Sequence, residues 1–117
     1  MLFMEYPSCS TCQKAKRWLD ERNYAYTDRH IKEEKPTAAE LREWCARSGL
    51  PLRRFFNTSG LVYKSLGLKD RLPAMPEEEQ LQLLASDGML VKRPILVDGD
   101  TVLVGFRPEE WERALIK

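Results

Sequence analysis

The chain has 117 residues, a length that fits one domain, and its 19 basic and 18 acidic side chains leave a net charge of +1. This balance disfavours direct binding to nucleic acid, which normally requires a basic excess. No apolar run reaches the ~20 residues of a membrane helix, the first residues lack a secretory-signal pattern, and an odd number of cysteines disfavours a secreted disulfide framework. We therefore expect one cytoplasmic domain, residues 1–117, that enters no membrane and keeps its thiols reduced.

The first quarter of the chain predicts a strand, a helix and a second strand. The apolar run "LFMEY" at 2–6 favours a strand, and helix formers with apolar residues at helical spacing fill 10–23. Ser8 and Ser10 are the candidate caps at the start of this helix. Tyrosines alternate with small or polar residues at 24–31, as in a half-buried strand. Because a helix joins the two strands, we expect them to be parallel.

The middle of the chain predicts helices and no strand. Thr37 and Glu40 have the spacing of a capping box at the start of one helix, and Gly49 marks its end. Prolines and glycines break residues 50–75 into short helical pieces. A further helix fills 76–86, with a proline at its start and glutamates in its first turn, where the helix dipole favours them.

The last part of the chain predicts a β-hairpin and a final helix. Two apolar runs in residues 93–106 flank the turn sequence "DGD", which is the strongest β pattern in the chain. Residues 107–116 have a proline and two glutamates near their start, which favour a helix. The whole order predicts an α/β fold, a four-stranded mixed sheet with helices on its faces.

Cys9 and Cys12 form a C-x-x-C pair at the junction of the first strand and the first helix. A cysteine at a helix N-terminus meets free backbone N–H groups and the positive end of the helix dipole, which favour the thiolate. One helical turn of separation lets Cys12 resolve a mixed disulfide formed at Cys9. The pattern therefore favours a redox dithiol, with Cys9 as the exposed nucleophile and Cys12 as the buried resolving thiol.

Two other interpretations of the pair stay open. Zinc normally needs four ligands, and the chain offers only Cys45 and His30 beside the pair, with no second C-x-x-C. No metal site is therefore predicted. The remaining interpretation is that the two thiols have a packing role alone.

Other polar candidates fit structural roles better than chemical ones. The lone His30 is expected to be a surface or packing residue, and Cys45, at an apolar helical position, is expected in the core. Arg53 and Arg54 are interpreted as a solvated helix face, with an anion or partner contact as the alternative. Three aromatic residues are expected in the core as parts of helical apolar stripes: Trp18, Trp44 and Trp111.

Three stretches of the sequence are informative together: "YPSCSTCQKAKRWL", "GLPLRRFFNTSG" and "ASDGMLVKRPILVDGDTVLVGF". With the total length, they resemble the arsenate-reductase-like family, which includes Spx-type regulators and arsenate-reductase-like oxidoreductases, and the resemblance covers essentially the whole chain. It implies a thioredoxin-like fold with a helical insertion before the final hairpin. That fold agrees with the predicted order of elements.

The resemblance also implies roles for single residues. Cys9 matches the catalytic cysteine of the family, and Arg93 matches an arginine that sits beside it and binds oxyanions. Pro94 matches a proline held in the cis form facing the active site, and Arg107 resembles a second anion-binding arginine. The expected catalytic residues are Cys9, Cys12 and Arg93. The expected anion-binding residues are Ser8, Ser10, Thr11, Arg93, Pro94 and Arg107.

The chain departs from arsenate reductases of this family at three positions. It has Glu5 in a region where they carry a histidine, Cys12 where they have a serine, and Asn57 where they place a third arginine. Losing an arginine and gaining a carboxylate weakens an oxyanion site, because charge-assisted hydrogen bonds are its main source of affinity. Arsenate is therefore not the expected substrate.

The expected function is that of a cytoplasmic, monomeric thiol–disulfide oxidoreductase. It is expected to bind no cofactor and to be recycled by glutathione, glutaredoxin or thioredoxin. One alternative is a Spx-type regulator, in which oxidation of the C-x-x-C changes binding to the C-terminal domain of the RNA polymerase α subunit. Gly49 falls close to a glycine of that contact. The other alternative is a genuine arsenate reductase coupled to glutathione or thioredoxin.

Overall fold

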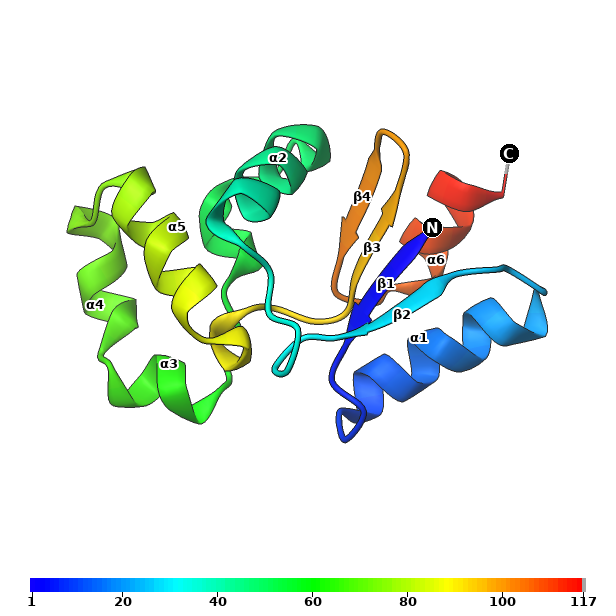
Figure 1. Cartoon of the computed structure of the whole chain (residues 1–117), viewed down its shortest axis with the longest axis horizontal. Helices are drawn as coiled ribbons and strands as arrows, with labels where there is room; N and C mark the ends of the chain where they lie inside the picture. The colour runs from blue at the N-terminus through cyan, green and yellow to red at the C-terminus, as the bar shows by residue number, and fades with distance from the viewer. Residues whose placement is uncertain (117) are drawn as a thin grey trace.

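The computed structural model describes residues 1–116 and has a central sheet with helices on both faces (Figure 1). The strands are β1 (Leu2–Glu5), β2 (Thr27–His30), β3 (Ile95–Asp98) and β4 (Thr101–Val104). The helices are α1 (Ser10–Glu21), α2 (Ala38–Ser48), α3 (Leu61–Ser65), α4 (Leu68–Arg71), α5 (Glu77–Ser86) and α6 (Pro108–Leu115). Short 3₁₀ helices are η1 (Leu52–Phe55), η2 (Leu72–Ala74) and η3 (Gly88–Leu90). Lys117, the last residue of the predicted domain, lies outside the described residues.

The sheet has the strand order β2–β1–β3–β4. β1 and β2 are parallel, whereas β3 is antiparallel to both β1 and β4. The hairpin between β3 and β4 turns at Gly99, whose φ of 58° is a conformation that glycine adopts without strain. The predicted α/β fold, a four-stranded mixed sheet with a helical region before the final hairpin, is therefore confirmed. We call that helical region, residues 38–90, the insertion. None of the helices in residues 1–116 has the length and apolarity needed to cross a membrane.

One face of the sheet packs against α1 and α6 through aromatic side chains. The rings of Trp18 and Trp111 meet edge to face with centroids 5.8 Å apart, and Phe106 lies 4.9 Å from Trp111. The indole N–H of Trp111 donates to the Gly105 carbonyl at 3.0 Å. Each such aromatic pair contributes about 0.5–1.5 kcal/mol beyond the burial of its area. With Trp44 on the other face, all three tryptophans are buried as predicted.

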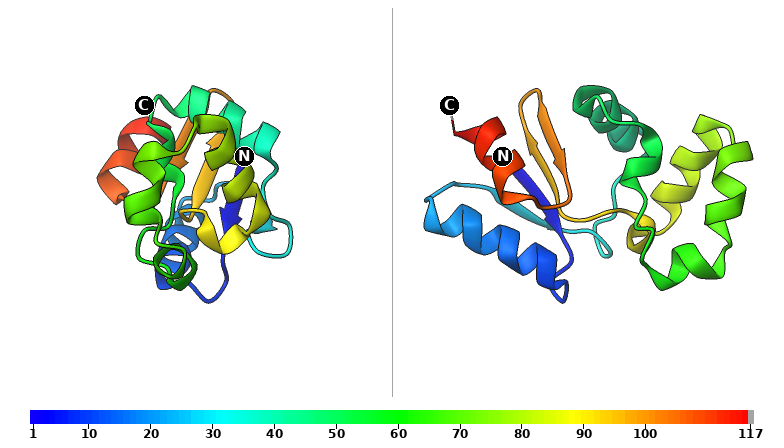
Figure 2. Two further views of the ribbon diagram at one scale, coloured as in Figure 1. Left: turned by 90° about the vertical axis from the view of Figure 1, so that its left-hand side faces the viewer. Right: turned by 180° about the vertical axis from the view of Figure 1, so that it is seen from behind.

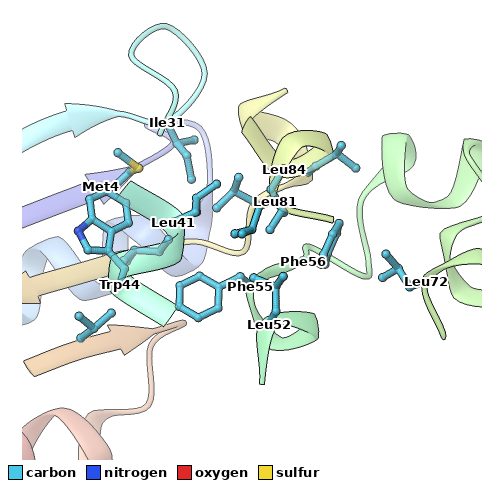
Figure 3. Close-up of a cluster of buried hydrophobic side chains, with 14 of the residues drawn as sticks. Met4, Ile31, Leu41, Trp44, Leu52, Phe55, Phe56, Leu72, Leu81 and Leu84 are labelled. Atoms are coloured by element: carbon cyan, nitrogen blue, oxygen red, sulfur yellow. The ribbon is translucent and has the colours of Figure 1, made fainter. Parts of the chain in front are cut away.

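The other face of the sheet packs against α2 and the rest of the insertion. Met4 of β1 lies in one buried cluster with Leu41 and Trp44 of α2, and this cluster continues through Phe55 and Phe56 toward α5 (Figure 3). The insertion therefore shares a hydrophobic core with the sheet. Its helices α3, α4 and α5 extend well beyond α2 on the side away from α1 and α6 (Figure 2).

The helix signals predicted for α2 are present in the structure. Thr37 Oγ1 accepts the N–H of Glu40 at 3.1 Å, and the Glu40 carboxylate accepts the N–H of Thr37 at 3.0 Å. Gly49 ends the helix in the left-handed conformation, with φ 70°. Glu40 also pairs with Arg29 at 2.7 Å, which ties the start of α2 to β2.

Two predictions at the ends of elements are wrong. Neither Ser8 nor Ser10 caps α1, because Cys9 occupies the N-cap position and its side chain makes no capping hydrogen bond. The second strand is shorter than residues 24–31, because the pairing with β1 starts only at Thr27. It is also more exposed than predicted, since β2 lies at the edge of the sheet.

The insertion is joined to the segment before β3 by two backbone hydrogen bonds. The N–H of Asn57 donates to the Leu90 carbonyl, and the N–H of Lys92 donates to the Phe55 carbonyl, both at 2.7 Å. We call this pair of hydrogen bonds the bridge. It fixes η1 and the loop after it against the chain that leads into β3.

A close backbone contact joins the end of α5 to the loop after β2. The helix stops at Ser86, just before the predicted Asp87-Gly88 stop signal. Gly88 packs directly on Ile31, so a Cβ atom placed there would lie 1.9 Å from the Ile31 carbonyl oxygen. The backbones can approach this closely only because Gly88 has no side chain.

Candidate active site

Cys9 lies where β1 passes into α1. It is the N-cap of the helix, and its N–H donates to the Tyr6 carbonyl at 2.9 Å in the turn before the helix. The first N–H groups of an α-helix have no helical partner. Those of Thr11 and Cys12 are hydrogen-bonding partners of the Cys9 sulfur. Because the Cys9 side chain is half-buried, a reagent can reach it while the helix start stabilises its thiolate.

Arg93 lies beside Cys9, in the segment before β3. The peptide bond between Arg93 and Pro94 is cis, as the resemblance implied. The guanidinium carbon of Arg93 lies 5.1 Å from the centroid of the Tyr6 ring, a cation–π contact. Its Nη1 atom is buried and has no hydrogen-bond partner among the described residues. A buried donor left without an acceptor costs about 1–3 kcal/mol, which a bound anion would offset.

A cavity of about 620 Å³, which we call the Cys9 cavity, opens beside Cys9. Its walls come from the start of α1, from the insertion, and from the segments that flank the hairpin. The lining residues include four cationic side chains and no acidic one. The four are Arg54, Lys92, Arg93 and Arg107. Such a concentration of one sign of charge attracts anions and favours the thiolate of Cys9.

The two thiols of the C-x-x-C pair have opposite pKa shifts. Burial acts to raise the pKa of Cys9, but hydrogen bonds from Cys12, Arg93 and the Thr11 N–H outweigh it, so this pKa lies below that of an ordinary thiol. Cys12 is fully buried. Its burial, together with the nearby Cys9 and Glu5, raises the pKa of Cys12 to about 12. Cys9 is therefore the thiol that ionises first.

A buried carboxyl group lies near the pair. Glu5, the last residue of β1, is only 3% exposed. Lys16 Nζ lies 3.4 Å from Glu5 Oε2 and 2.8 Å from Asp28 Oδ2. Burial and the hydrogen bond to Asp28 raise the pKa of Glu5 to about 7, although Lys16 acts in the opposite direction. Burial acts to raise the pKa of Asp28 too, but hydrogen bonds from Glu5 and Lys16 bring it below its usual value.

The structure brings together about half of the residues predicted from the sequence. Four of them line the Cys9 cavity: Cys9, Thr11, Arg93 and Arg107. Cys12 and Pro94 are buried next to lining residues and do not themselves line it. Ser8 and Ser10 are exposed on either side of Cys9 and are also absent from the lining.

The sequence interpretation missed what the insertion contributes. Arg54 is exposed, as expected of a solvated helix face, but it also lines the Cys9 cavity. Asn57 is 8% exposed and lines the same cavity. Gly60 leaves room for it, because a Cβ atom there would lie 2.7 Å from Asn57 Nδ2. Lys92 directly precedes Arg93 in the sequence. This adjacency was the one signal that could have indicated a fourth cation in the Cys9 cavity.

The other residues considered from the sequence, His30 and Cys45, have contacts that suit structural roles. No three His, Cys, Asp or Glu side chains in residues 1–116 gather in a way that could hold a metal ion. His30 Nδ1 accepts the N–H groups of Lys32 and Glu33 at 3.2 Å each, and its ring packs edge-on against Tyr6. Cys45 is half-buried against the core cluster of the insertion. All three cysteines are free thiols here, so a disulfide within the C-x-x-C pair stays a prediction.

A comparison with models of known protein families shows which family the chain belongs to. The model of the ArsC family matches residues 4–114. The chain belongs to the ArsC family. Membership of the ArsC family confirms the resemblance drawn from the motifs.

Several known proteins are similar to nearly the whole chain. The uncharacterized protein YusI of Bacillus subtilis is 50% identical over 112 residues, which cover 96% of this chain and 95% of YusI. The regulatory protein MgsR of Bacillus subtilis is 33% identical over 110 residues, covering 94% of this chain and 86% of MgsR. The crystal structure of an ArsC family related protein from Bacteroides fragilis has a TM-score of 0.93 at 60% identity, covering 96% of this chain and 94% of that one.

Proposed function

We propose that this ArsC family protein is a thiol–disulfide oxidoreductase in which Cys9 attacks and Cys12 resolves. The observation that carries this proposal is the asymmetry of the pair. Cys9 is accessible and has a lowered pKa, whereas Cys12 is fully buried with a pKa raised to about 12. A dithiol that attacks in a fixed order needs one reactive and one protected thiol.

The reaction passes two electrons from the dithiol to the substrate. The Cys9 thiolate attacks one sulfur of a disulfide, and the other sulfur leaves as a thiolate that takes up a proton. Cys12 then loses its proton and attacks Cys9, which forms the Cys9–Cys12 disulfide and releases the reduced substrate. Once Cys9 is in a mixed disulfide, its negative charge no longer raises the pKa of Cys12. The first step therefore makes Cys12 easier to deprotonate for the second step.

The protein returns to the dithiol form by reaction with two further thiol groups, which are left joined as a disulfide. Glutathione, glutaredoxin or thioredoxin would supply the two electrons, and no bound cofactor enters the reaction. Arg93 would stabilise the Cys9 thiolate and hold an anionic group of the substrate with its unpartnered Nη1. Thiolate stabilisation by a neighbouring guanidinium is a common means of activating cysteine.

Trapping of the mixed disulfide tests this function. A Cys12→Ser variant should accumulate an adduct at Cys9 when it is mixed with bis(2-hydroxyethyl) disulfide or oxidised glutathione, as measured by intact-mass and peptide-mass spectrometry. The wild-type protein should pass on to the Cys9–Cys12 disulfide, and a Cys9→Ser variant should form no adduct. Modification of Cys45 in place of Cys9, or no adduct at all, would contradict the proposal.

A second candidate is a redox-controlled regulator, and the similarity to a protein named as a regulatory protein favours it. In that case oxidation of the pair would change binding to the C-terminal domain of the RNA polymerase α subunit. A pull-down with this domain, under oxidising and reducing conditions, separates the two functions. No binding in either state would remove the regulator.

Arsenate reduction is the third candidate. Asn57 in place of an arginine disfavours it, whereas Arg54 and Lys92 add positive charge to the Cys9 cavity. Arsenate-dependent oxidation of NADPH, coupled through glutathione or thioredoxin, is the decisive assay. A null result with the wild-type protein, beside a positive result with a disulfide substrate, would end this candidate.

A further inference from the structure

A second cavity lies in the insertion, next to the Cys9 cavity. It has a volume of about 710 Å³, and we call it the insertion cavity. The two cavities share Arg54 and divide the loop after η1 between them. Thr58 lines the insertion cavity, whereas its neighbours Asn57 and Ser59 line the Cys9 cavity. The two cavities therefore adjoin at Arg54, on either side of the loop after η1.

The two cavities have different chemistry. The insertion cavity has apolar walls that include Leu52, Tyr63 and Leu72, with Arg53 and Lys69 among its cationic residues. Leu52 and Leu72 are buried in the core, so their packing holds these walls in place. The Cys9 cavity is lined by four cations and no carboxylate. One part of the joined surface suits an apolar side chain, and the other suits several anionic groups.

The size of the surface argues for a ligand larger than a single oxyanion. The Cys9 cavity alone lies within the ~300–1,000 Å³ typical of sites for drug-sized ligands. Its four cations come from η1, from the segment before β3 and from the start of α6, and together they carry more positive charge than one small oxyanion can neutralise. An extended peptide chain with anionic groups on both sides of its sulfur can neutralise them.

We propose that the substrate is a polypeptide disulfide whose reacting cysteine is flanked by acidic residues and by an apolar side chain. This proposal rests on the proposed oxidoreductase function and names its substrate class. The acidic residues would pair with Arg93, Arg107 and Arg54, and the apolar side chain would enter the insertion cavity. The Cys9 thiolate attacks the sulfur of the peptide cysteine and expels the other sulfur as a thiolate. Cys12 then attacks Cys9 and releases the peptide as a thiol.

Three peptide disulfides test the proposal in a single turnover. The first has its cysteine between two glutamates with a leucine at each end, the second has glutamines for the glutamates, and the third has serines for the leucines. Each cysteine carries a 2-thiopyridyl group, whose release as 2-thiopyridone is followed by absorbance. Each rate is divided by the rate of the same peptide with 2-mercaptoethanol, which removes differences in intrinsic reactivity. The first peptide should react ~10-fold faster than either of the others, since each lost set of contacts is worth at least one factor of ten.

Matched variants locate each preference. Arg54→Ala should reduce the preference for glutamate over glutamine, whereas Arg113→Ala, an equal change of charge on α6, should leave it unchanged. Thr58→Trp places a large side chain from an exposed position into the insertion cavity. It should abolish the preference for leucine and keep the preference for glutamate.

Each result has a defined meaning. Equal normalised rates for the three peptides, with the Cys9 adduct of bis(2-hydroxyethyl) disulfide still formed, would overturn the peptide proposal and leave the oxidoreductase function standing. A preference for glutamate alone, insensitive to Thr58→Trp, would assign the Cys9 cavity to a small anionic ligand and would also overturn it. Failure of Cys9 to react with any disulfide would remove both proposals together.

Discussion

Lys16 of α1 reaches the buried carboxyl group of Glu5 at the end of β1, with its Nζ atom 3.4 Å from Glu5 Oε2. The pKa of Glu5 is nevertheless raised to about 7, because burial and the hydrogen bond to Asp28 outweigh this attraction. Glu5 therefore holds a proton in the folded protein at pH values where it has lost it in the unfolded chain. Folding stability should depend on pH through this one side chain.

The first prediction concerns the sign of that dependence. Between the unfolded pKa of 4.5 and the folded pKa of about 7, the native state binds more protons at Glu5, so stability falls as pH rises. The loss from pH 5 to pH 7.5 should be ~2 kcal/mol in urea unfolding. Glu5→Gln, which keeps a hydrogen-bond donor toward Asp28, should remove most of this slope.

A control distinguishes this effect from a general change in stability. The pKa of Glu40 is lowered, chiefly by its hydrogen bond to Arg29, so its contribution is lost only as pH falls below the range tested. Glu40→Gln should therefore lower stability by the same amount at pH 5 and at pH 7.5. An unchanged slope in Glu5→Gln would show that Glu5 is not the titrating group.

The second prediction concerns the reactivity of Cys9. Hydrogen bonds from Arg93 and from the start of α1 hold the pKa of Cys9 below that of an ordinary thiol, so its alkylation by iodoacetamide should have its midpoint at a lower pH than the alkylation of free cysteine measured alongside. Arg93→Ala should move the midpoint to higher pH and slow the reaction at pH 7. Arg113→Ala should do neither. A midpoint unchanged by the loss of Arg93 would show that this arginine does not stabilise the Cys9 thiolate.

The third prediction concerns Gly88. An alanine Cβ there would lie 1.9 Å from the Ile31 carbonyl oxygen, and the atoms that it meets are backbone atoms that cannot swing away. Gly88→Ala should lower the free energy of unfolding by ~2 kcal/mol or more. Gly60→Ala is the matched comparison, because its closest contact is the side-chain amide of Asn57, which can move. Urea unfolding of both variants should rank Gly88→Ala as clearly the more damaging.

The fourth prediction concerns the capping box of α2. Thr37→Ala removes the acceptor for the Glu40 N–H and should cost ~1 kcal/mol in urea unfolding. Thr37→Ser keeps the hydroxyl group and should restore nearly all of that loss. Equal losses in the two variants would indicate that the threonine methyl group, and not the cap, is responsible.

Elements whose signals are local were predictable from the sequence. The capping box at Thr37, the glycine end of α2 at Gly49 and the hairpin turn at Gly99 each depend on a few neighbouring residues, and all three are present. The C-x-x-C pair could also be placed, because it lies between two strongly patterned elements. Family resemblance, not pattern, was needed for the cis bond before Pro94.

Features that depend on long-range contacts were not predictable. Arg54 lines the Cys9 cavity although it lies far from Cys9 in the sequence, and no local pattern says which way a long exposed side chain turns. The burial of Glu5 was missed for a related reason. β1 is an inner strand that is covered on both faces. Its side chains therefore do not alternate between buried and exposed positions.

The bridge between the insertion and the segment before β3 controls the position of one wall of the Cys9 cavity. Two hydrogen bonds, from Asn57 to Leu90 and from Lys92 to Phe55, hold η1 in place beside Cys9. Local unfolding that breaks them would carry Arg54 and Asn57 away from the thiol, and it would also draw Phe55 and Phe56 out of the core that they share with the sheet. Deuterium uptake at the amides of Asn57 and Lys92 would then measure how often Cys9 stands in an open groove, a quantity that sets how quickly a large substrate can enter and leave.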